Sequence, residues 1–332
     1  MAKTLVTGGA GFIGSHVVDE LVKEDHDIIV LDDLSGGFKE NVNPEAEFIE
    51  GSICDKELLR NIFKDNEFAF VFHLAAYAAE GLSHFIRNFN YNNNLIGSIN
   101  LINESIKQRV NCFVFSSSIA VYGKNQLPMK EDTTPMPEDP YGISKLAVEQ
   151  DLRCAREMFG LEYIIFRPHN VYGERQNIGD KYRNVIGIFM NQIMQNKPLT
   201  IFGDGEQTRA FSYIKDIAPI IAKSVLNQKA DYQIFNIGAD EPYTINELAS
   251  AVIKAMGVEN EYPILHLSPR NEVVDAYSAH ERVKKILGYR TQYTLEEGIR
   301  NMAEWAKKEG AKKSKEFKNI EITKNLPESW LK

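Results

Sequence analysis

Short runs of apolar and β-branched residues alternate with longer amphipathic stretches along the first 125 residues. This alternation is typical of βαβ units, in which helices join neighbouring parallel strands. Because such crossovers are right-handed, helices cover both faces of the sheet, and we predict a doubly wound α/β fold. The predicted strands are 4–7, 28–31, 46–50, 69–74, 112–116 and 163–167, and the predicted helices are 14–24, 56–65, 89–108 and 140–159.

The pattern changes beyond Asn170, where Gly, Asn and Pro become frequent. Short β-like runs and separate amphipathic stretches indicate a smaller α+β lobe attached to the sheet. We expect a first domain over 1–175, to which segments after residue 205 return, a second lobe over 176–310, and a mostly solvated tail over 311–332. The runs are 199–202, 232–237 and 263–267, and the helical stretches are 184–195, 216–227, 245–256 and 295–309.

Charge and composition narrow the possible partners. With 38 Lys and Arg against 46 Asp and Glu, the formal net charge of −8 disfavours nucleic acid as a partner. The cysteines Cys54, Cys112 and Cys154 form no CxxC pattern, so we predict no metal site and a reducing compartment. No run reaches the ~18 apolar residues of a membrane span, and no signal-peptide pattern is present. We therefore expect a cytoplasmic protein without a membrane partner.

A glycine-rich motif, Thr7-Gly-Gly-Ala-Gly-Phe-Ile-Gly14, lies between the first predicted strand and the first predicted helix. Glycines allow the backbone to approach a pyrophosphate, and the helix N-terminus offers amide groups to this anion. Asp32 follows the second strand, where a carboxylate can bind the adenosine ribose hydroxyls and repel a 2′-phosphate. A plain glycine turn followed by an acidic turn is the alternative. In this context the pattern favours a dinucleotide site for NAD over NADP.

A serine run ending at Ser118 precedes Tyr141 and Lys145, which are four residues apart at the start of a predicted helix. Residues at this spacing share a helix face, so the ammonium could lower the pKa of the phenol and make it a usable base. The serine hydroxyl could then bridge the base and a substrate hydroxyl. Alone, this spacing is more often a solvated pair. After a dinucleotide motif, it indicates hydride chemistry.

Five ordered motifs over roughly residues 3–305 resemble the extended short-chain dehydrogenase/reductase family, and within it the nucleotide-sugar epimerases. They are TGGAGFIG at 7–14, the segment 32–37, HLAA at 73–76, SSSIAVYG at 116–123 and YGISK at 141–145. The resemblance implies a Rossmann-type sheet with a substrate-binding lobe, NAD as cofactor and a homodimer. It assigns the cofactor contacts to Gly8, Gly11, Phe12, Ile13, Gly14, Asp32, Ser52, Ile53, Leu74, Ala75, Ala76, Asn93, Tyr141 and Lys145, and catalysis to Ser118, Tyr141 and Lys145. At Ser52 the family more often has an Asp that contacts adenine.

The reaction implied by the resemblance is epimerisation at C4 of a UDP-hexose, interconverting UDP-glucose and UDP-galactose. Hydride passes from the sugar to tightly bound NAD, a 4-keto sugar turns over, and the hydride returns to its other face. Ile119 and Ala120 stand where family dehydratases have an acid pair, so no second acid–base pair is expected. The alternatives are a UDP-glucuronate 4-epimerase, a GDP-mannose 3,5-epimerase-like enzyme, a nucleotide-sugar reductase, and an NAD-binding sensor without turnover.

The resemblance also implies substrate contacts in the second half of the chain. Asn170 corresponds to a family residue that binds diphosphate, and Arg209 and Arg270 to its nucleotide-binding arginines. Surface or interlobe ion pairs are the alternative for each arginine. Seven residues beyond Arg270, Tyr277 is expected to limit space at the sugar 2-position. The remaining open positions are Glu80 and His169, as pocket or ordinary residues, and Leu95, Ile99, Ile102 and Ile106, as a dimer face or a face packed on the sheet.

Overall fold

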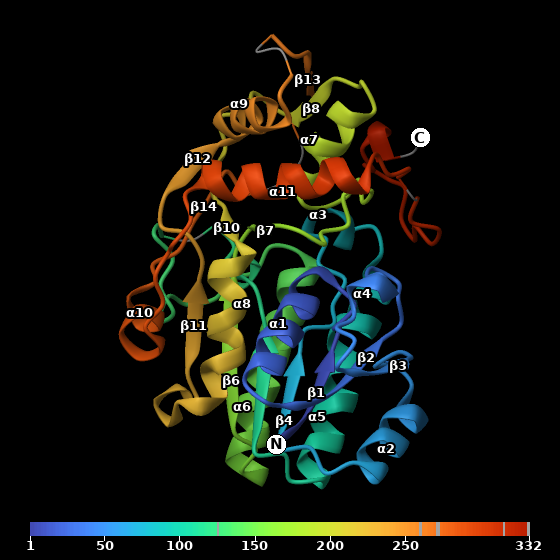
Figure 1. Ribbon diagram of the computed structural model, residues 1–332, viewed down its shortest axis with the longest axis vertical. Helices are drawn as coiled ribbons and strands as arrows, with labels where there is room; N and C mark the ends of the chain where they lie inside the picture. Colours follow the sequence, from blue (N-terminus) through green and yellow to red (C-terminus); the bar gives the residue numbers. More distant parts are fainter. Residues whose placement is uncertain (125, 259–260, 270–272, 315, 331–332) are drawn as a thin grey trace.

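The centre of the computed structural model is a seven-stranded parallel sheet, which confirms the predicted fold class (Figure 1). The structure describes residues 1–332 except 125, 259–260, 270–272, 315 and 331–332. One edge strand comes from beyond residue 230 and pairs in parallel with the strand at Tyr163–Pro168. The strands, in spatial order, are β11 (Ile234–Ile237), β6 (Tyr163–Pro168), β5 (Cys112–Ser116), β4 (Phe70–His73), β1 (Lys3–Thr7), β2 (Asp27–Asp32) and β3 (Glu47–Glu50).

Alternating side chains of the central strands enter two separate cores, because successive residues of a strand face opposite sides of a sheet. In β1, for example, Leu5 packs into one core and Val6 into the other. Both are fully buried, as expected for a sheet covered on its two faces. Helices α1 (Phe12–Lys23) and α8 (Ile214–Lys223) cover the Val6 face, and α2 (Lys56–Asp65), α5 (Gly97–Lys107) and α6 (Pro140–Phe159) cover the Leu5 face.

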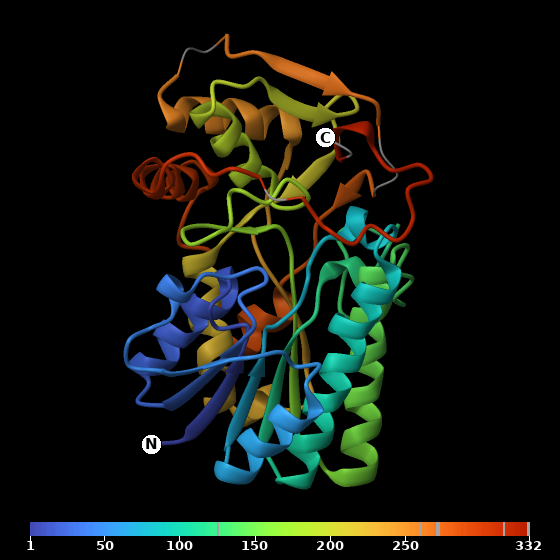
Figure 2. The same cartoon turned by 90° about the vertical axis from the view of Figure 1, so that its right-hand side faces the viewer.

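The second lobe lies over the carboxyl ends of the strands (Figure 2). Two of its helices begin at strong local signals: Thr244 with Glu247, and Thr294 with Glu297, form reciprocal capping boxes. Its small sheets are separate from the central one. The remaining elements are α3 (Glu80–Ser83), α4 (Arg87–Tyr91), β7 (Val171–Tyr172), α7 (Val185–Met194), β8 (Leu199–Phe202), β9 (Thr208–Ala210), β10 (Ser212–Tyr213), β12 (Pro242–Thr244), α9 (Ile245–Met256), β13 (Ile264–Leu267), β14 (Asp275–Ala276), α10 (Glu281–Leu287) and α11 (Leu295–Glu309).

The long helix predicted over 89–108 is interrupted by a π-helical turn, Asn92–Ile96, between α4 and α5. The turn places Asn94 against the loop that follows β4, where its side chain accepts from the amide of Tyr77 at 2.8 Å and donates to the carbonyl of Tyr77 at 3.0 Å. On α5 itself, Ile102 is 1% exposed and belongs to the core between the helices and the sheet. This face therefore packs on the sheet.

Most described residues of the C-terminal tail are exposed, as expected, but a few of its apolar side chains pack against the rest of the molecule. The tail crosses from α11 to the neighbourhood of α3 and α4 (Figure 2). The Glu321 carboxylate accepts hydrogen bonds from the amides of Asn88 and Phe89 at 2.8 and 2.9 Å, which caps the first turn of α4. Leu326 and Trp330 are 7% and 5% exposed. Burial of these apolar side chains offsets the conformational entropy that ordering the tail costs.

We expect Trp330→Ala to detach the end of this tail. The Trp330 ring packs edge-on against Tyr182 and Phe85, with centroids 5.3 and 6.2 Å away. Removing a buried Trp side chain costs about 3–5 kcal/mol, so local opening should become at least about 100-fold more frequent. Limited proteolysis followed by mass spectrometry should show faster cleavage within 311–330. Exposed Leu226→Ala is the control, and equal cleavage rates in all three proteins would contradict the anchoring role.

Candidate active site

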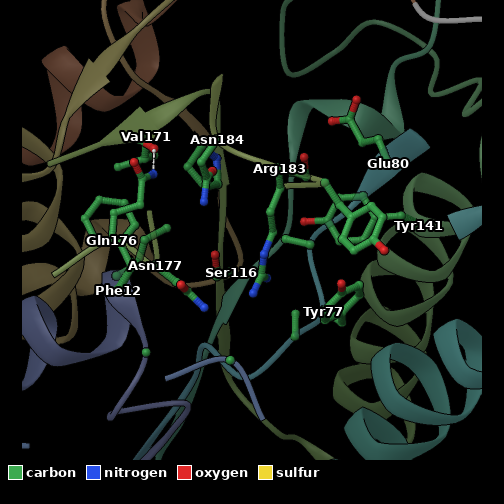
Figure 3. A pocket seen from close by; sticks show the side chains of 18 of the residues that line it. Phe12, Tyr77, Glu80, Ser116, Tyr141, Val171, Gln176, Asn177, Arg183 and Asn184 are labelled. Atoms are coloured by element: carbon green, nitrogen blue, oxygen red, sulfur yellow. Dashed lines mark hydrogen bonds between the residues drawn. The ribbon is translucent and has the colours of Figure 1, made fainter. Parts of the chain in front are cut away.

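A cleft of about 450 Å³ opens between the carboxyl ends of the central strands and the second lobe (Figure 3). Ligands of open α/β sheets bind in this position, where the loops after neighbouring strands diverge. The cleft collects nearly all of the predicted site residues that the structure describes. Those lining it are Gly8, Gly11, Phe12, Ile13, Gly14, Asp32, Ser52, Ile53, Leu74, Ala75, Ala76, Asn93, Ser118, Tyr141, Lys145, Asn170 and Arg209.

The glycine-rich turn between β1 and α1 is shaped for close approach of a ligand to the backbone. Gly8 has φ +76°, and a Cβ there would lie 2.7 Å from the amide nitrogen of Ala75. A Cβ on Gly14 would lie 2.0 Å from the carbonyl oxygen of Gly8, so only glycine fits where α1 enters the turn. The first amides of α1 face the cleft with the positive end of the helix dipole. This cradle fits the pyrophosphate of a dinucleotide.

The Asp32 carboxylate stands at the end of β2, beside the glycine turn. It accepts hydrogen bonds from the amides of Ala10 at 3.0 Å and Leu34 at 2.8 Å, which fix its orientation. Burial raises the pKa of Asp32, and these two amide contacts counteract the rise. Each oxygen keeps acceptor capacity toward the cleft, which fits the paired hydroxyls of a ribose. Ser52 and Ile53 border the same end of the cleft.

Tyr141 and Lys145 lie in the first turns of α6, which Asp139 caps by accepting from the amide of Gly142 at 2.9 Å. Lys145 Nζ donates to the carbonyl of Ser116 at 2.7 Å and lies 5.8 Å from the centre of the Tyr141 ring. Burial lowers the pKa of Lys145 to about 7. The hydrogen bond to Ser116 holds Nζ at the floor of the cleft, while burial makes the neutral amine easier to form than in an exposed lysine.

The phenol pKa differs from the expectation that Lys145 would lower it. Burial is the largest cause, and it raises the pKa of Tyr141 well above its usual range, with the charge of Glu80 acting in the same direction. A hydrogen bond from the Ser118 side chain and the charge of Arg183 act against this rise. The protein's own groups thus keep Tyr141 protonated. Formation of the phenolate therefore requires additional positive charge close to the Tyr141 hydroxyl.

A buried polar network that sequence reasoning missed lies directly behind the serine run. Arg167 and Glu149 form a bidentate ion pair, with Nε and Oε1 2.9 Å apart, and both side chains are at most 2% exposed. Ser117 Oγ donates to the same carboxylate. Arg167 also donates to the Tyr122 hydroxyl at 2.6 Å. The network joins α6 to β5 and β6, and so fixes the distance between Tyr141 and the serine run.

His73, the histidine of the HLAA segment, is a buried structural residue. Its Nδ1 and Nε2 lie 2.7 Å from Thr7 Oγ1 and 2.8 Å from Ser98 Oγ, and the ring is 1% exposed. Burial, with a smaller contribution from the charge of Lys145, lowers the pKa of His73 to about 3. The ring holds β1, β4 and α5 together in its neutral form.

This pKa predicts acid sensitivity of the fold. Between about pH 6.5 and 3, the unfolded chain binds a proton at His73 that the folded protein does not, so stability falls as the pH falls. The slope is up to about 1.4 kcal/mol per pH unit for one proton. Urea unfolding at pH 6.5 and pH 5 should therefore show a loss about 2 kcal/mol smaller in His73→Asn than in the unmodified protein. Exposed His266→Asn is the control, and an equal loss in both variants would refute the assignment.

The predicted substrate residues are only partly brought together. Asn170, with φ +42°, lines the cleft, and its Nδ2 donates to the carbonyl of Ala210 at 3.1 Å. Arg209 also lines the cleft, but its guanidinium holds the backbone carbonyls of Val273 and Val274. Arg270 lies outside the described residues. Tyr277 is not among the described residues that line the cleft, whereas Val273 is, so the structure gives no support to the predicted role of Tyr277 at the sugar 2-position.

Glu80 and His169, whose roles the sequence left open, differ in their positions relative to the cleft. Glu80, at the start of α3, lines the cleft (Figure 3). His169 is 2% exposed and does not line it; its Nδ1 lies 3.0 Å from the carbonyl of Ala210, and its Nε2 lies 3.0 Å from Nε2 of His280. His169 is thus a satisfied core histidine. Among the described residues, no cluster of His, Cys, Asp and Glu could hold a metal ion, and no helix could cross a membrane.

Several lining residues carry no motif and were missed. Most come from the segment 173–184, between β7 and α7, which runs along the cleft (Figure 3). The place of this segment in the sequence could have indicated these residues, because it directly follows the Asn170-Val-Tyr-Gly173 stretch that leads out of β6. The residues in question are Tyr77, Gln176, Asn177, Tyr182, Arg183 and Asn184; Ser116, within the serine motif, also lines the cleft.

Comparison with known proteins agrees with this geometry. The model of the NAD dependent epimerase/dehydratase family matches residues 4–238, and the chain belongs to this family. The UDP-glucose 4-epimerase of Lactobacillus helveticus is 32% identical, with 92% of this chain and 97% of that protein covered. The crystal structure of Thermotoga maritima UDP-glucose 4-epimerase with UDP-glucose superposes with a TM-score of 0.88 at 36% identity, covering 92% of this chain and 99% of the other. Thermus thermophilus UDP-glucose 4-epimerase, complexed with NAD, gives 0.84 at 30% identity over 91% and 98%.

Proposed function

We propose that the protein catalyses NAD-dependent epimerisation at C4 of a UDP-hexose, interconverting UDP-glucose and UDP-galactose. One observation carries the proposal: Tyr141, Ser118 and Lys145 meet beside the glycine turn in a single cleft, and Ile119 and Ala120 follow the serine without a second acid–base pair. One proton-transferring group at one carbon suits oxidation and return of hydride at that carbon. The relatives named above as UDP-glucose 4-epimerases, one solved with UDP-glucose and one with NAD, support it.

The cofactor-facing residues fit NAD along the length of the cleft. The amides at the start of α1 would hold the pyrophosphate, Asp32 the adenosine ribose, and Ala75 and Lys145 the nicotinamide half. When bound, NAD supplies the hydride acceptor and later returns the hydride. Because the cofactor is regenerated in place, the protein gains nothing from releasing it.

The protein's own groups handle the proton. Tyr141 accepts the proton of the sugar 4-hydroxyl as hydride leaves C4, and gives it back when hydride returns. The Ser118 hydroxyl, 8% exposed at the N-cap of a short 3-10 turn, orients that hydroxyl toward the phenol. The phenolate that this transfer requires would be favoured by a protonated Lys145 and by the positive nicotinamide ring of bound NAD, acting against the rise that burial causes in the Tyr141 pKa. We assign Asn170, which follows β6, and Arg209, in β9, to the nucleotide diphosphate, because both line the cleft.

The direct test is chromatography of the purified protein incubated separately with UDP-glucose, UDP-N-acetylglucosamine and UDP-glucuronate, without added NAD. We expect UDP-glucose to be converted to UDP-galactose. Conversion of one of the other two sugars alone would reassign the substrate while keeping the reaction. Absence of turnover on all three, with and without added NAD, would contradict the proposed function.

We also propose a homodimer, assembled through the outer faces of the paired helices α5 and α6. Ile96 and Ile143, just before α5 and within α6, are 45% and 42% exposed, which leaves apolar surface on this side of the sheet. Light scattering should give about twice the chain mass of 37.7 kDa. A single-chain mass at micromolar concentration would contradict the dimer.

A further inference from the structure

We propose that Arg183 is an anion clamp, which reaches from the interlobe segment 173–184 over the pyrophosphate of the bound dinucleotide and retains it. The inference rests on the proposed function, since it takes NAD as the ligand. It adds a positioning residue from outside the glycine turn and the Tyr141–Lys145 pair. Arg183 belongs to none of the sequence motifs that point to the cofactor.

The Arg183 side chain is held inside the cleft from two sides. Its Nε donates to Asp180 Oδ2 at 2.7 Å, and the two side chains are 16% and 9% exposed. The guanidinium carbon lies 4.7 Å from the centre of the Tyr77 ring, a cation–π geometry. Figure 3 shows the side chain reaching into the cleft between Ser116 and Tyr77. Such a side chain has lost most of its rotamer freedom before any ligand arrives.

The far end of the guanidinium stands next to the glycine turn. A Cβ on Gly36 would lie 3.1 Å from Arg183 Nη2. The neighbouring Gly37 packs on the turn itself, because a Cβ there would lie 2.7 Å from the amide nitrogen of Gly11. Asp180 takes the Nε–H, and none of the hydrogen bonds between described residues uses Nη1 or Nη2 of Arg183. The four remaining N–H groups therefore lie in the cleft with their donor capacity available to a ligand.

The pyrophosphate is the anion that fits this position. Gly36 follows Asp32 on the adenosine side of the cleft, and Tyr77 follows Ala75 and Ala76 on the nicotinamide side. A group that contacts both Gly36 and Tyr77 lies across the middle of a dinucleotide bound between these ends. The middle of NAD carries its two negative charges. The first amides of α1 would face these two charges from one side. The Arg183 guanidinium, of a kind that pairs bidentately with phosphate, would face them from the other side.

The clamp also links cofactor retention to the second lobe. The segment that carries Arg183 leads directly into α7, and the adjacent Tyr182 packs on Trp330 of the C-terminal tail. Departure of NAD would require the guanidinium to leave both Asp180 and the phosphates. Retention of this kind suits a reaction in which the cofactor is regenerated in place.

The test compares Arg183→Gln with Arg183→Lys and with the control Arg175→Gln. Arg175 is on the same segment, but its Nη1 lies 2.7 Å from Asp19 of α1, and it does not line the cleft. NAD extracted from each purified protein is quantified, and cofactor-free protein is titrated with NAD, ADP-ribose, adenosine and UDP by calorimetry. In Arg183→Gln we expect less co-purified NAD and an about 10- to 100-fold higher Kd for NAD and for ADP-ribose, which share the pyrophosphate. The Kd for adenosine should not change, Arg183→Lys should fall between, and the control should match the unmodified protein.

Three outcomes would overturn the clamp. If Arg183→Gln binds NAD and ADP-ribose as tightly as the unmodified protein, the clamp is wrong and the proposed function stands. If the Kd for UDP rises while that for ADP-ribose does not, Arg183 serves the substrate diphosphate. If the unmodified protein binds neither NAD nor ADP-ribose, the proposed function fails together with the clamp. Thermal unfolding of each variant shows whether the fold is intact.

Discussion

Replacing Tyr141 by Phe should lower kcat by about 10²- to 10⁴-fold, the usual contribution of a positioned proton-transfer group. The ring would keep its place in the first turn of α6, and only the hydroxyl that exchanges a proton with the sugar would be lost. Because the tyrosine is buried and Lys145 bonds to Ser116 rather than to the phenol, the fold and the lysine position should not change. KM for the nucleotide sugar should change much less than kcat.

The measurement is UDP-galactose formation at saturating UDP-glucose, together with the NAD content of the purified variant. Tyr262→Phe is the control, since this hydroxyl bonds to the carbonyl of Lys197 in the second lobe, outside the cleft. Full NAD content with strongly reduced kcat would assign the effect to proton transfer. Undiminished turnover in Tyr141→Phe would show that another group exchanges the proton and would contradict the mechanism.

Elements with local signals could be predicted from the sequence. Helices α2 and α6 begin and end at the predicted residues, because Asp55 and Asp139 cap their first turns and Pro140 occupies the first helical position of α6. The glycine-rich turn and the position of Asp32 could be predicted for the same reason. Their geometry depends on residues that are neighbours in the sequence, at the end of a strand. The family resemblance is confirmed by the match over residues 4–238.

Features that depend on contacts between distant segments could not be predicted. Leu326 and Trp330 lie in a mostly polar stretch, and nothing nearby in the sequence indicates that Ala79 and Leu82 form their binding surface. The position of Tyr277 was inferred by counting residues, whereas in the structure Ala276 pairs with Arg209 and Val273, not Tyr277, lines the cleft. Burial, too, is a property of the folded chain. It explains why the pKa of Tyr141 is raised where helix spacing alone suggested the opposite.

Arg167→Met should destabilise the folded protein by about 3–5 kcal/mol, because it leaves the carboxylate of Glu149 buried without its partner. The pair is inaccessible to water on both sides, so solvent cannot substitute for the lost charge. Ser117 and Tyr122 would also each lose part of their hydrogen-bonding network. Urea unfolding at pH 7.5 should show the loss as a lower midpoint, with the slope of the transition preserved.

The double replacement Arg167→Met with Glu149→Leu separates an unpaired charge from general disruption of the core. If the cost of the single variant comes from the uncompensated carboxylate, removing that carboxylate should restore much of the stability. Turnover should nevertheless remain low in the double variant, because Ser117 loses the carboxylate that fixes the serine run relative to α6. A double variant as unstable as the single one would instead show that packing, not charge, holds this junction together. Stability recovered without recovery of kcat would establish that the buried pair serves to position the catalytic residues.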